Sequence, residues 1–194
     1  MAANPIPRLT ATEYLAMEEA ATFKSEFLGG EVFAMAGASY AHVVLVGNLC
    51  GELGNELRGK PCRAVSSDLL FRVGEGRLFA YPDVMVFCGP VEFAGDGQRV
   101  ALNPIVVAEV LSPSTERFDR GRKAAEYRKC ESVQQYVLVS QDEAMVEIYT
   151  REPDGLWRLR EVEGLDGVVA LSSLGVEVLM RALYEGVELD GAAS

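Results

Sequence analysis

The feature that most constrains the fold is a run of strand, helix and strand between residues 104 and 140. The apolar segment PIVVAEVL (104–111) precedes a charged helix expected at about 118–129, and QQYVLVS (134–140) follows. This order is typical of a crossover connection between parallel strands of one sheet. It predicts an α+β or α/β protein with a central mixed β-sheet flanked by helices.

The other segments predict further elements around this unit. Thr10 and Glu13 fit a capping box, which indicates a helix that ends near residue 20. Gly29-Gly30 favours a tight hairpin, and apolar residues recur at helical spacing over 39–57. More strands are expected at 62–65, 69–73, 82–87, 145–150 and 156–162, with a short helix near the C-terminal end. No repeat or long linker is visible, so residues 1–194 are predicted to form a single domain.

Net charge limits the partners that such a chain can bind. The sequence holds 18 Lys and Arg against 29 Asp and Glu, a net charge of −11. This charge argues against a broad basic surface that would coat nucleic acid. Residues 104–130 nevertheless hold six bases against four acids, a local balance of +2. A contact with DNA is therefore expected to be local, near residues 104–130, or assisted by a metal.

The sequence also predicts a compartment. No apolar run approaches the ~20 residues that cross a bilayer, and the N-terminal residues have no apolar signal core. The four cysteines are scattered without a CxxC pair, and the chain has one His. A zinc site and a membrane association are therefore not expected. We interpret the cysteines as reduced thiols in the core of a cytoplasmic protein.

One acid in each of two apolar strands carries the predicted chemistry. Glu109 lies within PIVVAEVL, and an ionised carboxylate in a strand buried on both faces is costly unless something binds it. Asp83 lies near the start of the segment PDVMVF (82–87). Neighbouring strands can place both carboxylates at one point, and oxygen ligands completed by water suit Mg²⁺ or Mn²⁺. Asp83 and Glu109 are thus the predicted metal ligands.

The following helix offers a cation for the same site. Asp119, Lys123 and Tyr127 recur at i, i+4 and i+8, on one face of the predicted helix. A helix packed beside its own strand can return Lys123 to Glu109.

Several segments resemble the Uma2 family (DUF820), a branch of the restriction-endonuclease-like fold. The resemblance covers nearly the whole chain and rests on KSEFLGGEVFAM (24–35), SYAHVVLVGNL (39–49), YPDVMVF (81–87) and the long segment 104–139. The wider PD…(D/E)xK superfamily of nucleases carries a lysine two residues after its second acid, where this chain has Leu111. The resemblance implies a phosphodiesterase site with Asp83 and Glu109 as metal ligands and Lys123 as the relocated lysine.

The resulting hypothesis is a metal-dependent DNA endonuclease, with a homodimer expected because cutting a duplex needs two sites. Two alternatives stay open. One is a nuclease-fold protein that binds nucleic acid or a protein partner and does not cut. The other is a metal-dependent hydrolase of small phosphate compounds, which suits an acidic protein.

Each site residue also has a purely structural interpretation. Glu109 could form a salt bridge to Arg122 or Lys123, Asp83 could cap a turn, and Lys123 could pair only with Asp119 on the helix surface.

Three further residues are auxiliary candidates. Glu26 could add an acid from the N-terminal side or be an exposed strand acid. His42 could contact substrate or metal, or be packed or solvent-facing. Ser112 belongs to a run of hydroxyls that could touch a phosphate, although such residues usually cap a helix.

Overall fold

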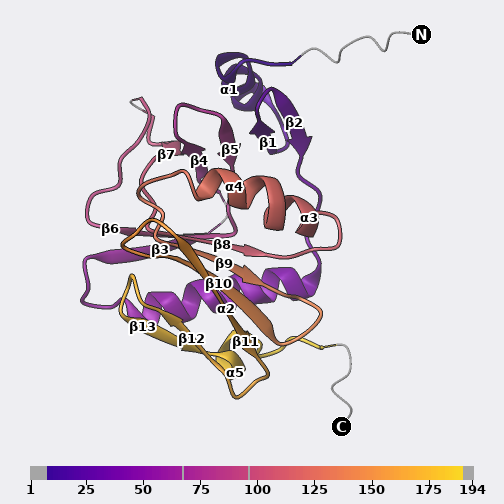
Figure 1. The fold of residues 1–194 in the computed structure, drawn as a ribbon. Helices are drawn as coiled ribbons and strands as arrows, with labels where there is room; N and C mark the ends of the chain where they lie inside the picture. Colours follow the sequence, from indigo (N-terminus) through magenta and orange to yellow (C-terminus); the bar gives the residue numbers. More distant parts are fainter. Residues whose placement is uncertain (1–7, 67, 96, 190–194) are drawn as a thin grey trace.

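A computed structural model gives the structure of the protein, and it describes residues 8–66, 68–95 and 97–189. A six-stranded sheet in the order β11-β10-β9-β8-β6-β3 forms the centre (Figure 1). Its strands are β3 (Cys62–Ser66), β6 (Val84–Cys88), β8 (Val106–Val110), β9 (Gln135–Val139), β10 (Met145–Arg151) and β11 (Trp157–Glu163). β8 and β9 pair in parallel, as the predicted crossover requires, and the other pairs are antiparallel.

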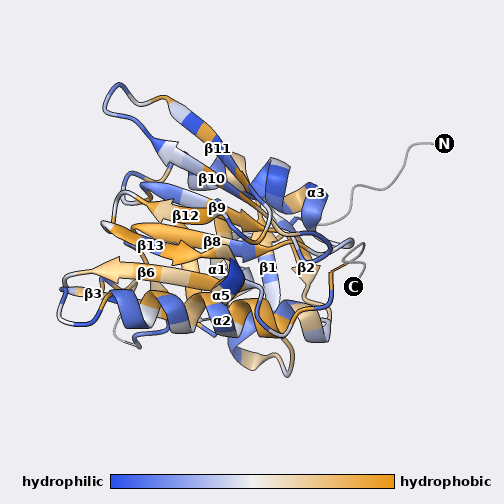
Figure 2. Ribbon diagram, turned by 90° about the horizontal axis from the view of Figure 1, so that it is seen from below, coloured by the Kyte–Doolittle hydropathy of each residue, from blue (hydrophilic) through white to orange (hydrophobic). Residues whose placement is uncertain are grey.

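One face of this sheet is covered by the long helix α2 (Tyr40–Glu56). The hairpin of β12 (Val168–Leu171) and β13 (Val176–Leu179) lies beside α2 with the short helix α5 (Met180–Leu183) (Figure 1). Figure 2 shows alternating hydrophobic and hydrophilic bands along α2, as expected for a helix with one face on a sheet. Leu45, Leu49 and Leu53 form its buried face.

The other face carries the helix that follows β8 and a second, smaller sheet (Figure 1). The helix runs through α3 (Glu116–Phe118), a π-helical turn η1 (Asp119–Lys123) and α4 (Ala124–Tyr127). The small sheet has the order β2-β1-β5-β4-β7. Its strands are β1 (Ser25–Leu28), β2 (Glu31–Ala34), β4 (Leu70–Val73), β5 (Leu78–Ala80) and β7 (Val100–Ala101), and α1 (Ala11–Ala20) packs against β1.

Most of the predicted elements are confirmed. Thr10 and Glu13 form both hydrogen bonds of a capping box at the start of α1, and Gly29 and Gly30 take the positive φ angles of 59° and 98° that the β1–β2 turn needs. The helix expected at about 118–129 begins earlier, at Glu116, and contains a π-helical turn. The sequence patterns missed β5, β7, β12 and β13.

Alternation along β6 and β8 divides their side chains between the two layers. The side chains packed in the α2 layer are Val84, Val86, Val106, Ala108 and Val110. Those packed in the opposite layer are Met85, Phe87, Val107 and Leu111. Residues 83 and 109 therefore belong to the second set, on the side of the helix 116–127.

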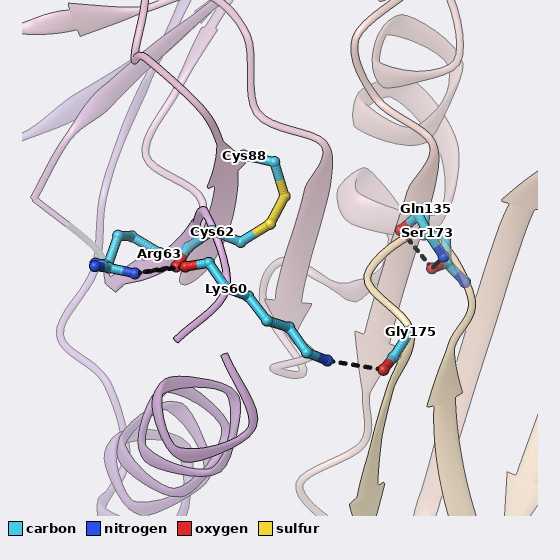
Figure 3. The surroundings of a disulfide bond; sticks show 7 residues. All are labelled: Lys60, Cys62, Arg63, Cys88, Gln135, Ser173 and Gly175. Carbon is cyan, nitrogen blue, oxygen red and sulfur yellow. Dashed lines mark hydrogen bonds between the residues drawn. A yellow bond between two sulfur atoms is a disulfide. The ribbon is translucent and has the colours of Figure 1, made fainter. Parts of the chain in front are cut away.

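The prediction that all four cysteines are reduced thiols is wrong for two of them. Cys62 and Cys88 form a disulfide between β3 and β6 (Figure 3). They are directly opposite each other in the antiparallel pairing, which brings their Cα atoms to 4.0 Å. This proximity depends on the register of β3 against β6. The sequence does not show this register, because the two cysteines are 26 residues apart. Cys50 and Cys130 are free thiols.

Among residues 8–66, 68–95 and 97–189, no helix has the length and apolar character needed to cross a membrane.

Candidate active site

The pairing of β6 with β8 brings the two predicted metal ligands together. Val84 is opposite Ala108, so Asp83 and Glu109 stand one position further along the same antiparallel register. The backbone N–H of Val110 donates to Asp83 Oδ2 at 2.7 Å, and the N–H of Asp83 donates to Glu109 Oε2 at 3.4 Å. Both carboxylates therefore lie at one end of the sheet, on the same face.

Lys123 reaches this point from the helix that follows β8. Its Nζ lies 2.9 Å from Glu109 Oε1, 2.9 Å from Glu26 Oε1 and 3.2 Å from Asp119 Oδ1. All four side chains are at most 9% exposed. One buried amine is thus shared by three carboxyl groups that come from three different elements. The π-helical turn begins at Asp119 and ends at Lys123, and such turns are frequent at functional sites.

Glu26 is part of this group and is not an exposed strand acid. Its residue is 7% exposed, and every residue of β1 is buried. Its Oε1 also accepts a hydrogen bond of 3.1 Å from the backbone N–H of Tyr81. The small sheet therefore contributes a carboxylate to the same point as β6 and β8.

His42 and Ser112 lie at the edge of the site. Ser39 caps α2, which places His42 in the first turn with its Nε2 3.1 Å from Asp83 Oδ1. Ser112 exchanges hydrogen bonds with the hydroxyls of Ser114 at 3.0 Å and Thr115 at 2.9 Å.

All of the candidate residues line one cavity of about 590 Å³. They are Glu26, His42, Asp83, Glu109, Ser112 and Lys123.

Two of the ion pairs expected from a purely structural role are present as well. Glu109 does pair with Lys123, and Lys123 does contact Asp119. Arg122 instead pairs with Glu31 at 2.7 Å. The Lys123–Asp119 contact is buried, unlike the surface pair that the helix pattern allowed.

Two buried tyrosines support the acids, and the sequence patterns did not assign them this role. The hydroxyl of Tyr127 donates to Glu109 Oε1 at 3.0 Å, and that of Tyr136 donates to the carbonyl of Asp119 at 3.2 Å. The signal for Tyr127 was its position four residues after Lys123. Tyr136 gave a weaker signal, as a polar aromatic beside the apolar residues 137–139 of β9.

The electrostatics of the site favour the binding of a cation. Burial raises the pKa of Glu109 well above its ordinary value of 4.5, and the nearby carboxyl groups add to the rise while Lys123 opposes it. Burial also raises the pKa of Glu26, again against Lys123. Burial disfavours the charge of Lys123, but Glu109, Glu26 and Asp119 outweigh it and raise the pKa of the amine. The carboxyl groups therefore hold protons more readily than in water, and a cation bound beside them would take the place of those protons.

The donor set fits Mg²⁺ or Mn²⁺. The acids of the site offer carboxylate oxygens, the ligands that these cations prefer, and the buried Asp119 Oδ1 is contacted by Lys123 Nζ at 3.2 Å without a hydrogen bond of good geometry. Within the described ranges, no group of three or more His, Cys, Asp and Glu side chains is arranged to hold a metal ion by itself. Mg²⁺ commonly binds through one or two carboxylates with water and substrate phosphates, so Asp83 and Glu109 are a sufficient protein contribution.

Comparison with known proteins places this architecture in the restriction-endonuclease-like class. A solved structure described as "a putative nuclease belonging to DUF820" from Anabaena variabilis matches with a TM-score of 0.75 over 91% of this chain and 97% of that chain. The two sequences are 20% identical, so this likeness shows the fold. The chain belongs to the Uma2 family, described as "Putative restriction endonuclease", whose family model matches residues 11–181.

Two relatives come from Synechocystis sp. "Uncharacterized protein sll1609" is 38% identical over 168 residues, which are 87% of this chain and 95% of the relative. "Uncharacterized protein slr1290" is 33% identical over 183 residues, which are 94% of this chain and 95% of the relative. The predicted family and fold are confirmed, and the family description supports a nuclease-like function.

Proposed function

We propose that this protein is a metal-dependent phosphodiesterase that hydrolyses nucleic acid, with DNA as the expected substrate. Asp83 and Glu109 would hold Mg²⁺ or Mn²⁺, and Lys123 would stabilise negative charge on the phosphate. The observation that carries the proposal is the meeting of these three side chains in one cavity. They come from the residue before β6, from β8 and from the helix after β8.

A divalent cation held there would lower the pKa of a bound water and neutralise charge on the phosphate. The chain itself supplies the positioning. Val110 N–H and His42 Nε2 contact the two oxygens of Asp83, and the Tyr127 hydroxyl fixes Glu109. Carboxylates held in this way do not have to reorganise when a charged substrate arrives, which is the main advantage of a preorganised site.

Lys123 contributes a permanent positive charge within the cavity. Its raised pKa keeps the amine protonated at neutral pH, so it acts as a cation and not as a base. Because it is buried, its attraction for a phosphate oxygen is screened less than that of a surface lysine.

The ion pairs of the basic residues in the segment 104–130 determine how broad a contact with DNA can be. Of the six bases in that segment, four pair with acids of the protein: Arg120, Arg122, Lys123 and Lys129. The expected contact is therefore narrow, centred on the cavity. A homodimer and a cytoplasmic location remain part of the proposal.

The test compares the wild-type protein with Asp83→Asn and with a matched control, Asp166→Asn. The Asp166 carboxylate is exposed and pairs with Arg181, away from the cavity. Cleavage of plasmid and of single-stranded DNA is measured with Mg²⁺, with Mn²⁺ and with chelator. We expect Asp83→Asn to lose roughly 10²–10³-fold in rate, as when a group that stabilises a transition state is removed.

The control should cleave as the wild type does. Equal cleavage by Asp83→Asn and the wild type would exclude the assigned site. Salt-sensitive binding of DNA without any cleavage would instead support a nuclease-fold protein that binds and does not cut.

A further inference from the structure

The side chains that line the cavity fall into three chemical groups. The first is the carboxyl groups around Lys123. The second is the linked hydroxyls of Ser112, Ser114 and Thr115. The third is apolar, with Val43 and Val46 from α2 and Phe33, Met35 and Phe118 from the opposite side of the sheet. The proposed hydrolysis uses the first group and leaves the apolar group without a role.

Two of the apolar side chains that line the cavity are exposed to solvent. Val43 is 57% exposed and Met35 is 39% exposed. The rings of Phe33 and Phe118 lie beside each other, with centroids 4.8 Å apart. Apolar side chains beside a few polar groups in one cavity are typical of a site that binds the apolar part of a ligand. Apolar side chains in the same cavity as a phosphate site fit a nucleobase attached to the phosphate.

The cations around the cavity are already engaged by acids. Among the described residues that line it, the cationic side chains are Lys24 and Lys123, and they form ion pairs with Asp68 and with the buried carboxyl groups. Binding of a duplex relies on Lys and Arg contacts to several successive phosphates. This cavity and the net charge of −11 offer little for such contacts.

Size and depth also limit what can enter. A volume of about 590 Å³ is within the range of pockets that enclose one small organic ligand. The Glu109 side chain is 4% exposed, so a phosphate has to enter the cavity to reach it. In a duplex the bases are stacked and paired, and one of them must leave the stack before it can reach the apolar side chains of the cavity. A single strand presents its bases without that cost.

We propose that this cavity binds one unpaired nucleotide, with its phosphodiester at Lys123 and Asp83 and its base against the apolar side chains near Val43. The choice of a nucleotide over other phosphate compounds rests on the proposed phosphodiesterase function. A segment of single-stranded nucleic acid and a free nucleotide diester present the same chemistry to this cavity. A base-paired duplex does not.

Binding is measured with Ca²⁺, which uses the same oxygen ligands as Mg²⁺. The probes are a fluorescent single strand of about 12 nucleotides, within the usual site size for such binding, and the same sequence as a blunt duplex. The p-nitrophenyl ester of thymidine 5′-monophosphate serves as a competing small diester. We expect the single strand to bind about tenfold or more tightly than the duplex, and the diester to displace it, since one stacked base is worth about that factor.

The matched variants are Val43→Asp in the cavity and Leu179→Asp outside it. The two side chains have similar exposure, 57% and 58%. Val43 lies in the first turn of α2, where an acid is compatible with the helix dipole, so this variant should fold. We expect Val43→Asp to weaken binding of the single strand and of the diester about tenfold, because it replaces base contact with an anion. Leu179→Asp should bind as the wild type does.

The outcomes separate this inference from the proposed function. Duplex binding equal to or tighter than single-strand binding, failure of the diester to displace the strand, or normal binding by Val43→Asp would each overturn the nucleotide assignment. Fast duplex cleavage that depends on Asp83 would uphold the phosphodiesterase and remove the preference for an unpaired base. The expected binding pattern without cleavage of any substrate in Mg²⁺ or Mn²⁺ would uphold the cavity assignment and refute the phosphodiesterase.

Discussion

The two faces of the central sheet are built from alternate residues of the same strands, yet they differ in chemistry. In β8, Val106, Ala108 and Val110 pack under α2 in a largely apolar layer. On the opposite face of the same strand, Glu109 meets Lys123. Adjacent residues thus serve different purposes, and the strand has no polar face in the usual sense because both of its sides are buried.

The difference indicates where stability and function reside. Apolar burial stabilises the fold at roughly 25 cal/mol per Å² of buried surface and needs no particular partner. Charges removed from water stabilise little or cost free energy unless their partners are well placed. The α2 layer can therefore hold the sheet together while the opposite layer keeps charged groups ready for a ligand.

The largest effect is expected for Lys123→Met, which removes the only ammonium group that contacts Glu26, Glu109 and Asp119 among the described residues. Breaking a buried ion pair from one side costs about 3–5 kcal/mol in the free energy of unfolding. The loss should be greatest at neutral pH and should shrink as the pH falls and the carboxyl groups take up protons. Denaturant titration at several pH values measures both trends.

Lys129→Met is the matched control, because the Lys129 side chain is 60% exposed and its buried partner Glu126 keeps a second ion pair, with Arg77. An exposed cation contributes about 0–1 kcal/mol to such a contact, so this variant should unfold nearly as the wild type does. Equal stability losses for the two variants would show that losing the buried amine of Lys123 costs no more than losing an exposed one.

The next effect concerns the apolar layer. Leu49→Ala removes a side chain of α2 that is 1% exposed, which costs about 2–5 kcal/mol. The loss should be independent of pH, since the layer around Leu49 is apolar. Metal-dependent cleavage measured well below the unfolding temperature should be unchanged. A pH-dependent loss, or a loss of cleavage in the folded variant, would contradict the division between the faces.

The disulfide gives a somewhat smaller effect on the same apolar side. Cys62 belongs to the core under the sheet, and its bond to Cys88 closes a separation of 26 residues. Reduction should lower the free energy of unfolding by about 2–4 kcal/mol, chiefly because it frees the unfolded chain. The double variant Cys62→Ala/Cys88→Ala should show no response to reductant. Titration of four reactive thiols in denaturant without reductant would show that the bond does not form.

Much of the fold could be predicted from local signals. The capping box of Thr10 and Glu13, the glycine pair at 29–30 and the apolar period of α2 each act within a few residues, so the sequence displays them directly. β5 and β7 are short and rely on neighbours distant in the chain, and they were missed. The Cys62–Cys88 bond was missed for the same reason, because only the register of β3 against β6 creates it.

The site divides in a similar way. Asp83 and Glu109 stood out because an acid in an apolar strand is unusual, and Lys123 because its helix follows the strand directly. Glu26 gave no comparable signal, since its burial depends on how the small sheet meets the large one. The spacing of Tyr127 from Lys123 placed it on the same helix face, but its hydrogen bond to Glu109 depends on tertiary packing.

The smallest effect on stability is expected for Glu109→Gln, although this change should abolish cleavage. The pKa of Glu109 is raised in the folded protein above its ordinary value of 4.5, so folding favours the protonated form. Its favourable contribution is therefore present below the unfolded pKa and is lost as the pH rises through the folded pKa. At neutral pH the unfolded chain carries the carboxylate form, which burial disfavours in the folded protein, and a neutral amide of the same shape removes that cost.

Glu109→Gln should thus be as stable as the wild type or more stable at neutral pH, and the difference should vanish as the pH approaches 4.5. Lys123 keeps Glu26 and Asp119 as partners, and the amide oxygen can still accept from Tyr127. Thermal unfolding of both proteins across this pH range provides the measurement. A loss of more than about 1 kcal/mol at neutral pH would mean that the Lys123–Glu109 pair stabilises the fold, because breaking a favourable buried pair costs at least that much. In that case both faces of the sheet would serve stability.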